Sequence, residues 1–185
     1  VSGFDISCRF FEISNNGKII VNHGYNGVYK LSVSSDFKNI IDYELDSIAV
    51  KGGNTSLDKF DNIIYYNYDK GMLKYNSLTN EFTKDTLLSN LSSKELLYGI
   101  IRNDKDGKLW LISENNIHYV YKDLVTGDKK INSLVFPLAL RRTVFENISK
   151  IDKSKYAIGT NYGYVTFDLD KYKLSPPVVE INKIE

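Results

Sequence analysis

Two histidines and one cysteine are the side chains of this sequence best suited to catalysis or metal binding. His23 stands in the stretch NHGYNGVYKLSV, beside Gly24 and Gly27, where it could line a phosphate or an oxyanion site, or lie in an ordinary turn. Neither His23 nor His118 has a second histidine or a carboxylate at the spacing of a zinc site. Cys8 has no histidine near it, and no Gly-x-Ser-x-Gly elbow occurs. These residues favour neither a zinc site nor a nucleophilic catalyst.

Carboxylates occur mostly in short polar stretches, such as NDKD at positions 103–106. The segment DKDG at 104–107 is similar to the start of a calcium loop, but it lacks the later bidentate glutamate of such loops. We therefore interpret these stretches as solvated hairpin tips. The sequence implies no metal ion and no cofactor.

The composition is that of a globular β-rich chain. Of 185 residues, 42% are apolar and 25% are charged, with 24 basic against 23 acidic side chains. This balance provides no field that would attract nucleic acid. No apolar run is long enough to span a membrane, and the opening VSGFDIS lacks the pattern of a signal peptide. Fourteen Tyr, nine Phe and only three Pro favour strands over helices.

The sequence contains four copies of one plan: an apolar run, a polar turn that ends in Gly or Asn, and an alternating run. The turn-ending residues are Gly27, Gly71, Asn116 and Gly163, at steps of 44, 45 and 47 residues. Gly and Asn tolerate the positive φ that tight hairpins need. A period of 40–50 residues in a β-rich chain indicates propeller blades, each a meander of four strands. The segment HGYNG is then the hairpin between the second and third strands of the first blade, so His23 belongs to a turn.

Two columns of the alignment predict how the blades pack. The residues four after the turn-ending position are Leu31, Tyr75, Val120 and Phe167, and those seven before it are Ile20, Ile64, Leu109 and Tyr156. We expect the first column to be buried between neighbouring blades, because the same strand phase recurs. His118 occupies an apolar column, so we expect it to be hydrogen-bonded and partly buried.

The strands of the third repeat are predicted at 98–103, 109–113, 117–122 and 129–135. The inner strand of the second repeat lies somewhere in SIAVKGGNTSLDKF and is hard to place. The stretch 85–98, DTLLSNLSSKELLY, has some helical character, but its Ser and Asn content favours a long connection.

The segments DGKLWLIS and AIGTNYGYVTFD resemble the two-component-regulator propeller repeat. Its signature of a glycine, an apolar–Trp pair, a small residue and a second glycine matches the residues Gly107, Leu109, Trp110, Ser113, Ile158, Gly159, Thr160 and Gly163. NHGYNGVYKL and YDKGMLKYN are also similar to repeats in the extracytoplasmic sensor regions of Bacteroidetes-type regulators. Trp occurs in one copy only; Val21, Tyr65 and Ala157 stand in the equivalent places.

The resemblance implies a domain plan. Residues 1–174 would form four propeller repeats, at about 5–46, 47–90, 96–135 and 144–174. The tail SPPVVEINKIE at 175–185 is similar to the lead-in to the triple-tyrosine immunoglobulin-like domain of such regulators. The propellers of that family are larger, often seven-bladed, so the four repeats would be a piece of one; a closed four-bladed ring is the alternative.

The candidate binding site is inferred from the positions of three tyrosines in the repeats. Tyr25, Tyr68 and Tyr162 all fall in hairpins between second and third strands, which propeller geometry places on one face. The connections between blades open on that same face. We expect Asn67, Arg141, Arg142 and Glu146 to supply polar groups there beside the aromatic rings. Such a surface suits a small polar ligand, an oligosaccharide or a peptide.

The function implied is a non-catalytic, periplasmic sensor module of a membrane-anchored regulator, whose kinase or DNA-binding part lies outside this chain. Its partners would be the remaining blades or a second receptor chain. A structural interaction propeller is one alternative. A carbohydrate-active lyase or hydrolase is another, but it would need His, Tyr or carboxylates converging at the central channel, where the inner strands offer mostly apolar, Asn and Lys residues.

Overall fold

The computed structural model describes residues 2–49, 55–68, 70–94, 102–104, 106–112, 116–135, 147–160 and 163–172. Its strands are β1 Phe10–Ile13, β2 Ile19–His23, β3 Gly27–Val33, β4 Ile40–Leu45, β5 Ser56–Phe60, β6 Ile63–Tyr68, β7 Gly71–Asn76, β8 Glu81–Lys84, β9 Arg102–Asn103, β10 Lys108–Ile112, β11 Asn116–Lys122, β12 Lys129–Val135, β13 Ile148–Asp152, β14 Lys155–Thr160 and β15 Gly163–Asp168. One helix, α1 Thr86–Lys94, lies between β8 and β9. The predicted all-β fold is confirmed.

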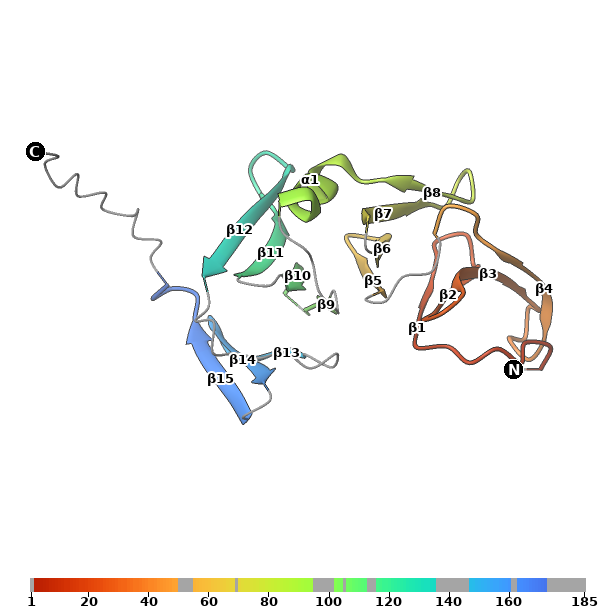
Figure 1. The fold of residues 1–185 in the computed structure, drawn as a ribbon, viewed down its shortest axis with the longest axis horizontal. Coiled ribbons are helices and arrows are strands. Elements are labelled where there is room, and N and C mark those ends of the chain that lie inside the picture. The colour runs from red at the N-terminus through yellow and green to blue at the C-terminus, as the bar shows by residue number, and fades with distance from the viewer. Residues whose placement is uncertain are drawn as a thin grey trace, which may run out of the picture.

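The strands form four antiparallel meanders in chain order: β1–β4, β5–β8, β9–β12 and β13–β15. We call these blades 1 to 4. They follow one another along an open arc, with β1, β5, β9 and β13 on its inner side (Figure 1). The inner strand of the second repeat, which the sequence left unplaced, is β5.

The hairpin glycines have the predicted conformation. Gly27, Gly71 and Gly163 have φ of 105°, 132° and 128°, which side chains rarely adopt. The segment HGYNG is indeed the turn between β2 and β3, and Gly27 is the residue in it that requires this freedom, since Gly24 has no positive φ.

One alignment column is wrong in the first repeat. Leu31 pairs with Ile19, whereas Tyr156 pairs with Phe167 and Leu109 with Val120. The reason is the β2–β3 loop, which has one residue more than the β6–β7 loop. Ile20 is therefore one strand position out of step with Ile64, Leu109 and Tyr156. Its side chain faces the following blade, blade 2, whereas theirs face the preceding blade.

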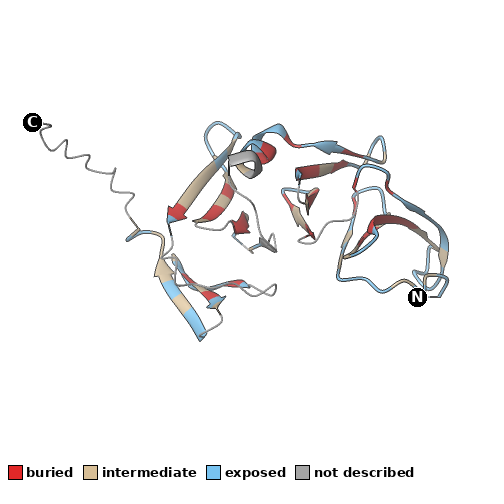
Figure 2. Cartoon of the chain, viewed as in Figure 1, coloured by how far each residue is buried: buried red, intermediate tan, exposed pale blue. Residues whose placement is uncertain are grey.

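Apolar cores join each blade to the next. The first lies between blades 1 and 2 and contains Ile20, Val28, Ala49, Leu57, Ile64, Tyr66, Leu73, Tyr75 and Phe82. The second lies between blades 2 and 3 and contains Phe60, Tyr65, Met72, Leu88, Leu109, Leu111 and Val120. The third lies between blades 3 and 4 and contains Trp110, Ile112, Ile117, Leu134, Ile148, Tyr156 and Ile158. Figure 2 shows buried residues mainly on the inner and middle strands, whereas β4 is largely exposed and β15 has exposed and intermediate residues only.

The predicted packing column is confirmed in the two central blades. Tyr75 and Val120 are buried between blades. Leu31 is buried too, but beneath Phe4 and Ile6 of the N-terminal segment. Phe167 is half-buried and packs on the third core. Among the described residues no core joins blade 4 to blade 1, so the arc does not close into a four-bladed ring.

The expectation of an irregular connection at 85–98 is wrong for its first part. Helix α1 begins directly after Asp85, whose side-chain oxygen accepts the backbone N–H of Leu88 at 3.0 Å. The backbone N–H of Ser89 donates to the Asp85 carbonyl at 2.9 Å. Leu88 is fully buried in the second core. Capping and one buried anchor thus outweigh the weak helix propensity of Ser and Asn.

A buried lysine links the outer parts of blades 1 and 2. The Lys30 ammonium lies 2.9 Å from Glu44 and 3.1 Å from Asp46, and donates to the carbonyl of Asn80 in blade 2 at 3.0 Å. Burial alone would lower the pKa of Lys30, but the hydrogen bonds to the two carboxylates raise it above its ordinary value. The ammonium is therefore held charged at the blade boundary.

Candidate ligand-binding face

The structure describes three of the seven predicted site residues. Tyr25, Asn67 and Tyr68 lie at the hairpin ends of blades 1 and 2. The other four, Tyr162, Arg141, Arg142 and Glu146, lie outside the described residues.

Tyr25 lies in a turn that side-chain hydrogen bonds hold in place. Its side chain is 82% exposed at the tip of the β2–β3 loop. Nδ1 of His23 accepts the backbone N–H groups of Tyr25 at 3.2 Å and Asn26 at 3.0 Å. The imidazole also contacts the Tyr25 ring edge-on, at 5.9 Å between centroids. His23 thus shapes the loop, and its role is structural.

Tyr68 is less exposed and more firmly held. Its ring stacks on Tyr66 with centroids 5.9 Å apart, and it packs against the first core. The adjoining β7 begins at Gly71 and Met72, and the Ser89 hydroxyl of α1 both accepts from the Met72 N–H and donates to the Met72 carbonyl. A Cβ at Gly71 would lie 3.0 Å from that hydroxyl. Helix α1 therefore fixes the hairpin next to Tyr68.

Asn67 lies inside the molecule, with 1% of its surface exposed. Asn22 occupies the equivalent place in blade 1 and is also buried; its amide donates to Thr55 at 3.2 Å. Both residues are next to last in their strands, opposite Met72 and Val28. The structure thus places Asn67 in the interior below the face, with the surface of the face formed by Tyr25 and Tyr68.

His118 is hydrogen-bonded, as predicted, and it is more deeply buried than expected. Only 1% of its surface is exposed, and its Nδ1 lies 2.8 Å from the hydroxyl of Ser133 on β12. His118 lies in blade 3 and His23 in blade 1, so the two histidines are not neighbours. No group of three or more His, Cys, Asp or Glu that could hold a metal ion occurs among the described side chains.

Two carboxylates on the inner strands were missed by sequence reasoning. Glu12 on β1 and Asp58 on β5 stand opposite Ile20 and Tyr65, at equivalent positions of their blades. Burial and the neighbouring Asp58 raise the pKa of Glu12, against the opposing influence of Lys59. A polar cavity of about 420 Å³ adjoins these residues.

Asp58, one of these two carboxylates, joins blades 2 and 3. Asp58 accepts the backbone N–H of Asn103 in blade 3 at 2.9 Å, and the Asn103 amide donates to the Lys59 carbonyl at 2.7 Å. The Lys59 ammonium in turn donates to the carbonyl of Ile13 in blade 1 at 3.0 Å. Asp58, Lys59 and Asn103 thus hold the inner strands of neighbouring blades together.

Asp104 departs from the expectation of a solvated hairpin tip. Its carboxylate accepts the Trp110 indole N–H at 2.8 Å and the Tyr156 hydroxyl at 3.2 Å. It also caps its own turn by accepting the backbone N–H of Asp106 at 3.0 Å and of Lys108 at 2.9 Å. The indole N–H of Trp110, the Trp of the repeat signature, therefore has its hydrogen-bond acceptor in Asp104, the first Asp of DKDG. Through Tyr156 the same carboxylate joins blades 3 and 4.

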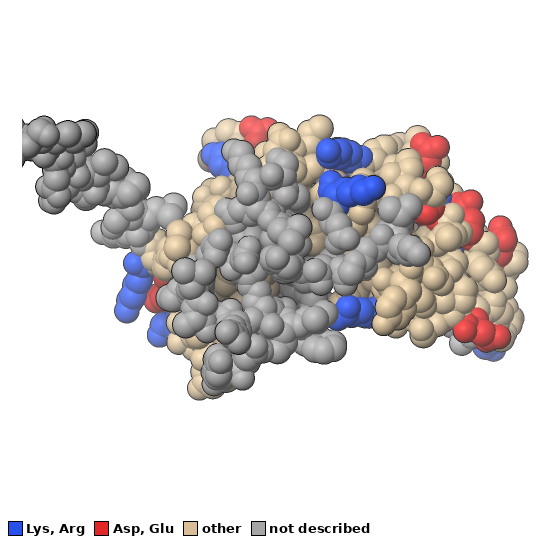
Figure 3. All heavy atoms as spheres, in the orientation of Figure 1, with Lys and Arg blue, Asp and Glu red and all other residues tan. Residues whose placement is uncertain are grey.

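On the face shown in Figure 3, most of the visible acidic side chains lie at the right-hand end, over blade 1, and most of the visible basic ones lie at the middle and the left. No helix within the described residues is long and apolar enough to cross a membrane.

Comparison with solved structures bears on the fold. The extracellular domain of a candidate one-component system from Bacteroides thetaiotaomicron aligns over 90% of this chain, with a TM-score of 0.58 and 15% identity. The extracellular domain of a candidate hybrid two-component system from the same organism aligns over 88%, with a TM-score of 0.55 and 16% identity. The chain has the fold of these regulator ectodomains. It spans 23% of the length of each.

The resemblance to regulator propellers that the repeats indicated is thus confirmed at the level of the fold. No family profile and no curated protein matches the sequence.

Proposed function

We propose that this chain is a non-catalytic sensing module in the periplasmic part of a bacterial signal-transduction regulator. The observation that carries the proposal is its likeness, over about nine-tenths of its length, to extracellular domains of two such systems. The inner-strand carboxylate of Asp58 is engaged in a hydrogen bond to blade 3, which supports binding over catalysis.

The proposed ligand surface is the face that carries the β2–β3 and β6–β7 hairpins. Tyr25 supplies an exposed ring and Tyr68 a ring fixed by stacking. We propose that Tyr162, Arg141, Arg142 and Glu146, which lie outside the described residues, also contribute to ligand binding. Flat aromatic surfaces beside polar groups bind a small polar ligand or an oligosaccharide at low entropic cost. Binding changes the output by favouring one receptor arrangement over another.

The partners proposed are further blades of the same propeller or a second receptor chain. Blade 1 offers the surface for them: Phe11, Tyr43 and Leu45 are 61%, 46% and 51% exposed and lie on the side turned away from blade 2.

Binding of a panel of defined oligosaccharides and short peptides, measured by isothermal titration calorimetry, tests the proposal. Tyr68→Ala should weaken binding severalfold, because an aromatic contact contributes about 0.5–1.5 kcal/mol beyond its buried area. Asp106→Ala, on the opposite rim, is the matched control and should bind normally. Equal binding by both variants would remove this face as the site, and turnover of an oligosaccharide would make the chain an enzyme.

A further inference from the structure

Strand β4 is an open edge of blade 1. Of the described strands it pairs only with β3, and it lies at the end of the arc away from blade 4 (Figure 1). Five of its six residues are exposed. The outer strands of blades 2 and 3 each bury an apolar side chain, Phe82 in β8 and Leu134 in β12.

The other two outer strands carry charges of the kind that protects an edge. β8 ends in Lys84, and β12 begins with Lys129 and Lys130. Lysines on an edge strand oppose pairing with a further strand. β4, with the sequence IIDYEL, has no lysine, so its edge is the least protected of the three.

The backbone of β4 offers hydrogen-bonding groups to an added strand. The N–H of Asp46, which directly follows β4, donates to the Val28 carbonyl of β3 at 2.8 Å. Successive residues of a strand turn their backbone groups to opposite edges. Asp46 and every second residue before it therefore face β3, whereas the N–H and C=O groups of Tyr43 and Leu45 face the open edge.

An extended segment already pairs with this edge where β4 begins. Ser2 forms a parallel bridge with Asn39. The Ser2 N–H donates to the Lys38 carbonyl at 3.0 Å, and its own carbonyl accepts the N–H of Ile40 at 2.9 Å. The pairing stops at this single bridge, and the next residue, Gly3, has a φ of 94°. The edge thus accepts an extended backbone, and among the described residues it is open beyond Ile40.

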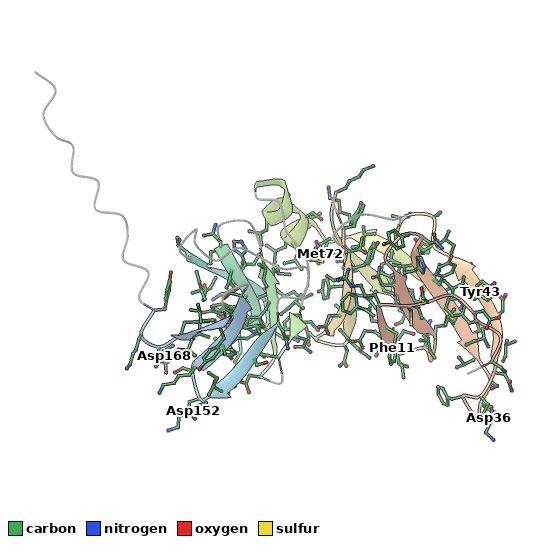
Figure 4. All side chains as sticks on the ribbon, turned by 60° about the horizontal axis from the view of Figure 1, so that its bottom comes forward. Phe11, Asp36, Tyr43, Met72, Asp152 and Asp168 are labelled. Atoms are coloured by element: carbon green, nitrogen blue, oxygen red, sulfur yellow. The ribbon has the colours of Figure 1, made fainter. Side chains whose placement is uncertain are left out.

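The two faces of β4 indicate which side chains an added strand would carry. On one face Tyr43 and Leu45 are 46% and 51% exposed, so apolar side chains beside them would bury their surface. Figure 4 shows Tyr43 on the outer side of blade 1. The other face carries Asp42 and Glu44, and most of the acidic side chains visible in Figure 3 also lie over blade 1. Basic residues of a partner would pair with these carboxylates.

A second copy of this chain fits the edge poorly. Pairing of β4 with another β4 would bring two sets of acidic side chains together, and like charges on adjacent strands are destabilising. The carboxylates of Asp42 and Glu44 therefore disfavour self-pairing and favour a basic partner strand.

We propose that β4 binds an extended segment of a partner protein, added antiparallel to β4, in which apolar residues alternate with basic ones. The apolar residues lie opposite Tyr43 and Leu45, and the basic ones lie next to Asp42 and Glu44. Antiparallel addition continues the pairing that joins β4 to β3. This inference does not depend on the proposed ligand.

NMR titration of the isotope-labelled full chain with a short capped peptide, in which valine alternates with lysine, tests the proposal. The chain is kept at a concentration at which sedimentation shows a monomer. The peptide should shift the amide signals of Tyr43 and Leu45 and slow their exchange, while the amides of β12 stay unchanged. Absence of binding, or equal shifts on β12, would overturn the proposal.

N-methylated peptides test whether the backbone makes the contact. In an antiparallel pair the residues opposite Tyr43 and Leu45 turn their N–H groups to β4, because hydrogen-bonded pairs exchange both bonds. Methylation of the valine nitrogens should therefore weaken binding roughly tenfold. Methylation of the lysine nitrogens, which point away from β4, should leave the affinity unchanged. Equal affinities of the two methylated peptides, or a larger loss on lysine methylation, would contradict the proposed pairing.

Charge reversal tests the choice of partner. Asp42→Lys should weaken binding of the valine–lysine peptide about fivefold, because a cross-strand attraction becomes a repulsion. Glu81→Lys, the same change at an exposed residue of β8, is the matched control and should bind normally. Equal losses in the two variants would show a general attraction between charges and overturn the proposal. So would slowed exchange at Tyr43 and Leu45 that increases with chain concentration in the absence of peptide, since the occupant would then be a second copy.

Discussion

At the residue scale, Asp104 shows how one carboxylate can hold two blades together. It accepts hydrogen bonds from Trp110 of its own blade and from Tyr156 of the next, and Trp110 is completely buried. The Trp110 and Tyr156 rings are also in contact, with centroids 4.8 Å apart. The stability of this boundary therefore depends on a group that the sequence alone presents as a turn residue.

Asp104→Ala should destabilise the chain by about 1–3 kcal/mol, because the buried indole N–H loses its acceptor. Urea unfolding followed by fluorescence measures this directly, since Trp110 is the only tryptophan. Asp106→Ala removes a surface ion pair to Lys150 and should leave the unfolding midpoint nearly unchanged. Equal losses in the two variants would contradict the assigned role of Asp104.

Buried tyrosines should make the fold sensitive to alkali. Burial raises the pKa of Tyr65 above its ordinary value of 10.0, helped by Asp85 and Asp61; burial and Asp104 act likewise on Tyr156. The unfolded chain ionises these phenols near pH 10.0, while the folded chain keeps their protons. Their contribution to stability is thus complete below that pH and is lost as the pH rises above it.

Tyr65→Phe tests this linkage. The free energy of unfolding, measured by urea titration at about pH 9 and about pH 11, should fall less steeply with pH in the variant than in the unmodified chain. An unchanged slope would show that Tyr65 does not contribute to the alkaline transition.

At the scale of elements, α1 and the β6–β7 hairpin stabilise each other. Gly71 and Gly163 open the third strands of blades 2 and 4 with nearly the same positive φ, 132° and 128°. A Cβ at Gly71 would meet Ser89 of α1, whereas a Cβ at Gly163 would have no atom of the described residues within 4 Å. Substitution at Gly163 therefore tests backbone strain alone, and substitution at Gly71 tests backbone strain together with steric contact with the helix.

Gly163→Ala should cost about 1–3 kcal/mol from backbone strain alone. Gly71→Ala should cost more, because Ser89 must also move. Urea unfolding of the two variants measures the difference, and circular dichroism checks that α1 persists. A smaller loss for Gly71→Ala than for Gly163→Ala would mean that the helix does not pack on this hairpin.

At the scale of the whole molecule, the two ends of the arc differ. Blade 1 turns Phe11, Tyr43 and Leu45 outward, and the N-terminal segment packs against Leu31 beside them (Figure 4 labels Phe11 and Tyr43). In blades 2 to 4 the equivalent side is covered by the preceding blade. Exposed apolar side chains gathered on one side of a blade in this way favour association.

The isolated chain should therefore self-associate with increasing concentration. Replacing Tyr43 and Leu45 together by Lys should shift sedimentation velocity profiles toward the monomer, because each charge opposes burial of the surface. Tyr164→Lys, at an exposed site of blade 4, is the control and should not change association. A monomer at all concentrations in the unmodified chain would show that the N-terminal segment covers blade 1 sufficiently.

The repeats, the order of strands and the hairpin glycines were predictable from the sequence because they are local signals. Alternation of apolar and polar residues over six or seven positions indicates a strand, and a glycine such as Gly71 or Gly163 indicates the hairpin before it. Neither signal depends on residues distant in the sequence. The position of Tyr25 in an exposed hairpin and the structural role of His23 in that hairpin were predictable from the same local signals. The helix was missed because Leu88 is stabilised by the core between blades 2 and 3, whose residues are distant from it in the sequence.

Only the tertiary structure decided which polar groups are used between blades. Asp58 with Asn103 and Asp104 with Tyr156 are pairs about one repeat apart in the chain, and no local pattern distinguishes them from exposed turn residues. The one-residue shift of Ile20 and the burial of Asn67 likewise depend on loop length and on the neighbouring blade. The sequence by itself therefore determined the blades, and contacts between blades determined which of their side chains remain free to bind a ligand, because burial is a property of the assembled arc.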